Sequence, residues 1–174
     1  VDAVQRALGD EEAALSWFWL SDELLLVLVF TRELSHTFTI ELSAQQHSQF
    51  ERWIVSMSTM AAGISSAIAS ELEDLVDTLA PTFLPTNIRE FVQGKSRLIL
   101  SPHRALHLLP FHAMRIADNV DKPWLIQHAA VRYVPNLASL LLEWNGNRTG
   151  PVLAIGINDF GDTGFPPLEN AKLE

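Results

Sequence analysis

Residues 98–109 read LILSPHRALHLL, and residues 110–114 continue with PFHAM. A short apolar run that ends at a turn signal is typical of a buried strand. The stretch therefore predicts a strand at residues 97–100, a turn at Ser-Pro-His, and a second apolar segment that stops at Pro110. Because helical sequence precedes this strand, we expect it to lie parallel to its neighbours.

Three strand candidates come earlier in the chain, at residues 14–20, 23–32 and 36–42. The turn residues between them favour an antiparallel meander, and we expect the middle strand to be central because both its faces are apolar. In the first strand Trp17 and Trp19 share one face, with Phe18 on the other. The aromatic face should be covered by a helix or by a neighbouring repeat domain.

Helical patterns surround these strands. Ser43 is a suitable N-cap for a helix over about residues 44–57, and a second helix over about residues 66–80 should be ended by Pro81 and Pro85. Other expected elements are the end of a helix at 1–8, a loop or frayed helix end at 56–66, a helical turn at 87–93, a strand at 130–134, a helix at 137–144 and a strand at 152–157. This order predicts an α/β fold with flanking helices, an antiparallel meander at the start and parallel strands later.

Composition narrows the class of protein. The chain has 174 residues, 48% of them hydrophobic, a net charge of −9 and no cysteine. These values predict a globular protein with no disulfide and no thiolate metal site, and the acidic balance argues against nucleic-acid binding. The longest apolar run, residues 24–30, is far shorter than the roughly 20 residues that span a bilayer. We therefore expect a cytoplasmic protein with no membrane partner, and both ends of the sequence suggest a fragment of a longer chain.

Histidines and a serine around the 97–100 strand raise two hypotheses about chemistry. A metal site formed by His103, His107 and His112 lacks a nearby acidic ligand, so we favour imidazoles that bond to loop carbonyls beneath the sheet. Ser101 and His103 could form a nucleophile and its base in an α/β hydrolase, but the sequence contains no Gly-x-Ser-x-Gly elbow. Packing at the end of the strand is the favoured role of Ser101.

Several segments, taken in order, resemble the CHAT domain family, which comprises caspase-like cysteine peptidases related to separases. They are LGDEEAAL at 8–15, RLILSPH at 97–103, ALHLLPFHA at 105–113, WLI at 124–126, YVPN at 133–136, VLAIGIN at 152–158 and PLENA at 167–171. The resemblance implies a caspase-like layered sheet and two caspase-like units in tandem. On this basis residues 1–9 end a preceding helical region, 10–146 form a non-catalytic unit, 147–151 are a linker, and 152–174 begin a catalytic unit that continues beyond the chain.

The resemblance also implies a cysteine endopeptidase whose Cys/His dyad lies outside this chain. No His here is followed by Gly and there is no Cys, so we assign no catalytic residue, no metal and no cofactor. The implied partners are a protein or peptide substrate, tetratricopeptide or other helical repeats in the same polypeptide, and a second chain that carries the dyad. The alternative is a non-catalytic, caspase-like module for protein interaction or regulation.

The loop after the 152–157 strand is the candidate substrate-binding segment. It contains Asn158, Asp159 and Asp162, and it follows the carboxyl end of an expected parallel strand, where ligands bind in open α/β sheets. In caspase-like folds this loop helps to line the pocket for the residue before the scissile bond. Asp159 or Asp162 would then favour a basic residue, although both acids would equally suit a solvated turn.

Overall fold

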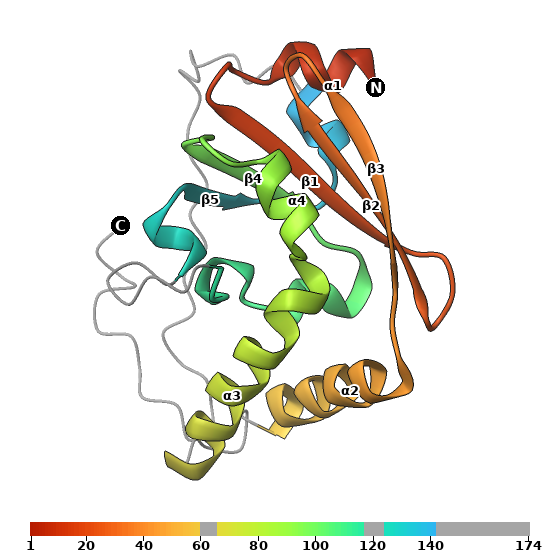
Figure 1. Ribbon diagram of the computed structural model, residues 1–174, viewed down its shortest axis with the longest axis vertical. Helices are drawn as coiled ribbons and strands as arrows, with labels where there is room; N and C mark the ends of the chain where they lie inside the picture. The colour runs from red at the N-terminus through yellow and green to blue at the C-terminus, as the bar shows by residue number, and fades with distance from the viewer. Residues whose placement is uncertain (60–65, 117–123, 142–174) are drawn as a thin grey trace, which may run out of the picture. The chain divides into compact units, whose positions relative to one another are not determined.

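The computed structural model describes residues 1–59, 66–116 and 124–141, all of which fall within one compact unit, Val1–Leu142 (Figure 1). Both the α-helices and the β-strands expected from the sequence are present. In chain order they are α1 Asp2–Ala7, β1 Glu12–Trp19, β2 Leu24–Thr31, β3 Ser35–Glu41, α2 Ala44–Thr59, α3 Ser66–Phe83, α4 Thr86–Phe91, β4 Arg97–Ser101 and β5 Ala130–Tyr133. Short 3-10 helices follow β4 and β5: η2 Arg104–Leu108, η3 Phe111–Ala113, η4 Leu125–Gln127 and η5 Leu137–Leu141.

The strands form one mixed sheet in the order β3-β2-β1-β4-β5. β1 pairs antiparallel with β2, and β2 pairs antiparallel with β3, whereas β4 lies parallel to both β1 and β5. The α/β class, the initial meander and the later parallel strands are therefore confirmed. As expected, the middle strand of the meander, β2, pairs on both sides. The middle position of the whole five-stranded sheet belongs to β1, which also pairs with β4 and whose residues from Ala13 to Trp17 are all buried.

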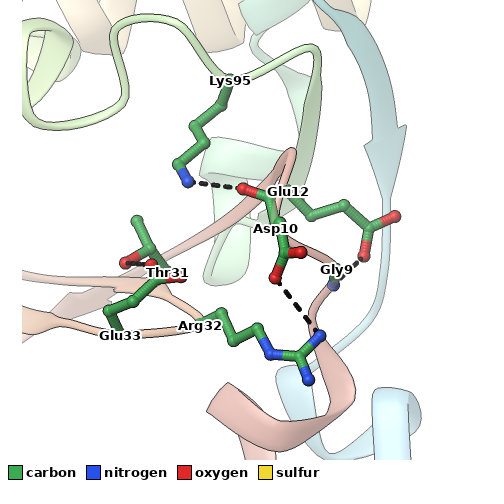
Figure 2. Close-up of polar contacts among 7 residues, drawn as sticks. All are labelled: Gly9, Asp10, Glu12, Thr31, Arg32, Glu33 and Lys95. Atoms are coloured by element: carbon green, nitrogen blue, oxygen red, sulfur yellow. Dashed lines mark hydrogen bonds and ion pairs between the residues drawn. The ribbon is translucent and has the colours of Figure 1, made fainter.

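Backbone and side-chain bonds hold the amino end of β1 against the turn before β4 (Figure 2). The backbone N–H groups of Ser96 and Arg97 donate to the Glu11 carbonyl over 3.0 and 3.1 Å. Lys95 Nζ donates to the Asp10 carbonyl over 2.6 Å, and the Asp10 carboxylate lies 3.3 Å from Arg32 after β2. Because the charged groups are exposed, these contacts position the three segments more than they stabilise them.

Helices of this chain cover the tryptophan face of β1, as expected. Trp17 is fully buried, its Nε1–H donates to the Phe83 carbonyl at the end of α3 over 3.1 Å, and its ring lies 4.5 Å from that of Phe111. Trp19 contacts Phe50 of α2 with 5.6 Å between ring centroids. The apolar stripes of α2 and α3 therefore face the sheet, and this layer contains most of the core.

On the opposite face of the sheet, the described helices cover only part of the surface. α1 and η5 pack there on a smaller cluster of Leu8, Ala14, Phe30, Ile99, Val134 and Leu137. Phe18 lies on this face nearer the other end of β1, and it is 40% exposed. Leu26, which pairs with Phe18 across β1 and β2, is half-buried.

The capping prediction for α2 is confirmed. Ser43 Oγ accepts from the Gln46 N–H over 3.3 Å, and the Gln46 side chain accepts from the Ser43 N–H over 2.9 Å, which forms a capping box. The prediction that Pro81 helps to end α3 is wrong, because Pro81 lies inside its last turn; the helix ends at Phe83, before Pro85. The Leu84 N–H still bonds to the Ala80 carbonyl, and the buried Phe83 and Leu84 anchor this turn in the core.

Two segments adopt 3-10 helices where the sequence suggested something else. The apolar segment expected after the 97–100 strand forms the short 3-10 helices η2 and η3. The helix expected over 137–144 is a 3-10 helix at Leu137–Leu141, and residues 142–144 lie outside the described part. The proposed division at 1–9, 10–146, 147–151 and 152–174 stays a prediction. Within the described residues, no helix combines the length and apolar character that crossing a membrane requires.

Candidate functional site

The carboxyl ends of β1 and β4 lie side by side, because the two strands are parallel and Ser16 is paired with Ser101. This is the edge of an α/β sheet at which ligands usually bind. Just beyond β4, His103 Nδ1 accepts a hydrogen bond from the backbone N–H of Trp19 over 3.2 Å. The imidazole also packs on Phe18, with 5.7 Å between ring centroids. His103 thus joins the two strand ends, and its Nδ1 carries a lone pair in this arrangement.

The structure gives the contacts of Ser101 and of two of the three histidines near β4. Ser101 is 4% exposed and its carbonyl accepts from Ser16 Oγ over 3.2 Å, so its role is packing at the end of the strand, as favoured. The expectation that the imidazoles bond to loop carbonyls is wrong for His103, which accepts from an N–H, and for His112, whose Nδ1 lies 3.0 Å from Tyr133 Oη. Among the described residues, no three His, Cys, Asp or Glu side chains are grouped to hold a metal ion.

Arg104, directly after His103, has a left-handed backbone with a φ of 54°. This backbone conformation is strained for any residue that has a Cβ atom, and backbone strain of this kind is concentrated at functional sites. It turns the chain sharply into η2, so that Arg104 and Ala105 border a hollow beside the strand ends. No residue in the described part forms an ion pair or side-chain hydrogen bond with the Arg104 guanidinium.

The hollow has a volume of about 540 Å³ and lies between the strand ends and α2. Its lining combines an apolar floor with charges of both signs. The residues are Trp19, Asp22, His47, Phe50, Glu51, Ile54, Val55, Arg104 and Ala105. A surface of this composition suits a peptide segment with an apolar side chain and a charged or polar neighbour.

Only some of the charged and polar side chains around the hollow have an ion-pair or hydrogen-bond partner in the described part of the chain. On α2, His47 Nε2 lies 3.3 Å from Glu51 Oε1, one helical turn away. His47 Nδ1 is buried and has no hydrogen-bond partner within the described ranges. Asp22, in the turn between β1 and β2, likewise has no ion pair with the described part of the chain. The site can therefore form hydrogen bonds and ion pairs with a ligand, but it contains no nucleophile next to a base.

Replacing Arg104 by glycine should stabilise the protein, because glycine adopts a φ of 54° without a Cβ penalty. We expect the free energy of unfolding to rise by about 0.5–1 kcal/mol after allowing for the greater freedom of glycine in the unfolded chain. Urea unfolding followed by circular dichroism measures the change. Arg104→Ala is the control, since it removes the same charge but keeps the strain. Equal stabilities for the two variants would contradict the prediction.

The phenol hydroxyl of Tyr133, at the end of β5, has a shifted pKa. Burial raises its pKa above the usual 10.0, although hydrogen bonds from the backbone N–H groups of His112 and Phe111 oppose the shift. Since the folded-state pKa is the higher one, the stability that the neutral phenol contributes is complete below about pH 10 and is lost as the pH rises through the folded-state pKa. This side chain is the sole tyrosine, so ultraviolet absorbance of tyrosinate reports on it alone.

The corresponding prediction concerns alkaline pH. We expect tyrosinate absorbance in the folded protein to appear at a higher pH than in the chain unfolded by urea. The thermal midpoint of Tyr133→Phe should also fall less steeply above about pH 10 than that of the parent protein. Because Tyr133 is 38% exposed, both differences should be small. Coincident absorbance titrations of the folded and unfolded chains would show the prediction to be wrong.

The substrate-binding residues predicted from the sequence, Asn158, Asp159 and Asp162, lie outside the described residues. The hollow at β1 and β4 was not predicted as a site. The i,i+4 spacing of His47 and Glu51 was a readable signal for a paired histidine on a helix. The left-handed Arg104 had no signal, because neither glycine nor asparagine marks the position.

Comparison with known families connects this fold to a class of protein. The model of the CHAT domain matches residues 61–174. The chain belongs to the CHAT domain family. A comparison with curated proteins gives no match. The matched segment contains the strand and turn sequences at 97–113, 124–126 and 133–136 on which the resemblance was based.

The CHAT match and the fold have different limits. The match begins after α2, so the meander of β1, β2 and β3 precedes it. However, β1 pairs directly with β4, which is in the matched segment. The folded unit of this CHAT protein therefore begins before the segment that identifies the family. The resemblance of residues 8–15 to the family lies outside the match.

Proposed function

We propose that the protein is the N-terminal part of a CHAT-type, caspase-like cysteine endopeptidase, and that it is a scaffold for a Cys/His dyad located beyond this chain. The observation that carries the proposal is the CHAT match over residues 61–174. The sequence supports the position of the dyad, because none of its 174 residues is a cysteine. The five-strand sheet supports the scaffold role, since its buried inner strands offer rigid strand ends on which loops can be held.

In the intact enzyme the dyad would act by nucleophilic catalysis. The thiolate would attack the carbonyl carbon of the scissile peptide, the histidine would transfer the proton to the leaving amine, and backbone N–H groups would stabilise the oxyanion. Asn158, Asp159 and Asp162 would line the pocket for the residue before the scissile bond. Asp159 or Asp162 would then select a basic side chain by charge pairing. Helical repeats of the same polypeptide, or a second chain that carries the dyad, would complete the assembly.

The test compares this chain with the whole polypeptide encoded by its reading frame. We expect the whole polypeptide to cleave fluorogenic peptides and to lose activity when its dyad cysteine is replaced by alanine. This chain alone should be inactive. In the active protein, Asp159→Asn or Asp162→Asn should raise KM for peptides with Arg or Lys before the scissile bond, whereas Asp10→Asn, at the exposed turn before β1, is the control. A reading frame without a His-Gly and a Cys segment would overturn the proposal.

A second candidate function is a non-catalytic module for protein interaction or regulation. The hollow beside β1 and β4 favours it, because its floor is apolar, its charges are partly unpaired and it lacks a nucleophile. A displayed library of random peptides, selected on the protein, would test this function. Peptides that bind the parent but not Trp19→Ala or Arg104→Gly would support it, provided that both variants unfold cooperatively. Peptides that bind all three proteins equally would count against it.

A further inference from the structure

The outer edge of β3 is open in the described part of the chain. β3 is the last strand on its side of the sheet, and no other described strand pairs with it (Figure 1). Natural edge strands are usually protected by lysine, by proline, by a bulge or by being short. β3 has seven residues, SHTFTIE, pairs with β2 without interruption from Ser35 to Glu41, and contains neither lysine nor proline.

Hydrogen bonds to β2 show which residues of β3 face outward. The Leu42 N–H donates to the Glu23 carbonyl over 2.7 Å, and the Leu34 carbonyl accepts from the Thr31 N–H over 2.8 Å. Since antiparallel strands alternate, the even-numbered residues of β3 direct their backbone groups to β2. The odd-numbered residues direct their N–H and C=O groups away from the sheet. They are Ser35, Thr37, Thr39 and Glu41.

The side chains of β3 separate into an apolar and a polar row. His36, Phe38 and Ile40 lie opposite the buried Val29, Val27 and Leu25, so they belong to the core face. Phe91 of α4 packs on both His36 and Phe38 there, with ring-centroid distances of 5.9 and 6.2 Å. The outward-directed odd residues carry the polar row on the other face.

We propose that this edge pairs with the same edge of a second copy of the chain, antiparallel and about a two-fold axis at Phe38. A two-fold axis perpendicular to the sheet keeps each face on its own side, so residues of equal parity meet. Phe38 then faces Phe38 and His36 faces Ile40, which extends the apolar row. Thr37 faces Thr39 and exchanges backbone hydrogen bonds with it.

The charges of β3 favour this self-pairing. Glu41 meets Ser35 of the second copy, so no two like charges lie directly opposite each other along the strand. Aromatic pairs and threonine pairs are both favourable across antiparallel strands. A shift of the axis to Thr37 would place Glu41 opposite Glu33, and repulsion disfavours that register. In the register about Phe38, the side chains of one β3 are therefore complementary to those of the β3 in the second copy.

Sedimentation equilibrium of the whole chain over a series of concentrations tests the proposal. The parent protein should form a dimer. Thr37→Lys/Thr39→Lys places lysine opposite lysine twice and should raise the dissociation constant about tenfold or more. Thr37→Lys/Thr39→Glu is the matched variant, since each lysine meets a glutamate and association should be retained. The two side chains are exposed, and urea unfolding checks that both variants keep the fold.

Three results would overturn the proposal. If the parent protein remains monomeric, the edge of β3 does not pair with a second copy, and an extended peptide of another protein becomes the alternative partner. A dimer that persists in the double-lysine variant would have to use a different surface. Loss of association in the lysine and glutamate variant would exclude the register about Phe38.

Discussion

Replacing Trp17 by alanine is expected to destabilise the protein by about 4–5 kcal/mol, which is a large part of the stability of an ordinary domain. The side chain is fully buried in the middle strand and packs on Phe111. Its loss would leave a cavity and would leave the Phe83 carbonyl without the Nε1–H donor. Urea unfolding measures the effect.

Two matched variants separate the causes of this loss. Trp17→Phe keeps most of the ring but removes the donor, and should cost about 1–3 kcal/mol. Phe18→Ala alters the next residue, which points to the other face of the sheet and is 40% exposed, and should cost about 1 kcal/mol or less. Similar losses for Trp17→Ala and Phe18→Ala would contradict the assignment of Trp17 to the centre of the core.

Residues 61–174, the segment that matches the CHAT family, should fail to fold without residues 1–60. In the whole chain β4 pairs with β1, and Leu98 and Leu100 are buried in the same core cluster as Leu15 and Trp17. Removal of β1, β2 and β3 leaves two described strands, β4 and β5, and a sheet of that size is not stable alone. Near-ultraviolet circular dichroism and cooperative unfolding are the measurements.

Complementation provides the control for the truncation. Co-expression of residues 1–60 with residues 61–174 should restore a complex with the spectrum of the whole chain, because the two pieces meet along the β1–β4 ladder. A shorter piece that unfolds cooperatively without the meander would show that the folded unit of this CHAT protein coincides with the family match.

The sequence predicted most of the fold because the decisive patterns are local. The alternation in β3, the continuous apolar run of β2 and the Ser43 cap of α2 each depend on a few neighbouring residues. The order of the strands was harder to predict, since it depends on which edge of the meander accepts β4. The extension of α3 past Pro81 depends on the burial of Phe83, which local propensity does not describe.

The candidate site was less predictable than the fold. His103 was singled out, but its bond to the Trp19 N–H joins residues 84 positions apart. The hollow depends on Arg104, whose left-handed backbone is imposed by the tertiary structure and opposes the preference of arginine. Such features arise when separate segments meet, so no short sequence pattern indicates them.

The central place of β1 has a consequence for the newly made chain. Its antiparallel partner follows within a few residues, whereas Ser16 and Ser101, which meet across β1 and β4, are 85 positions apart. At translation rates of about 5–20 residues per second, roughly 4–17 s pass before that second partner has been synthesised. Throughout this interval the edge of β1 that later pairs with β4 is unpaired, although α2 and α3 are synthesised before β4. The strand on which the finished sheet most depends is thus also the one most open to misassembly during synthesis.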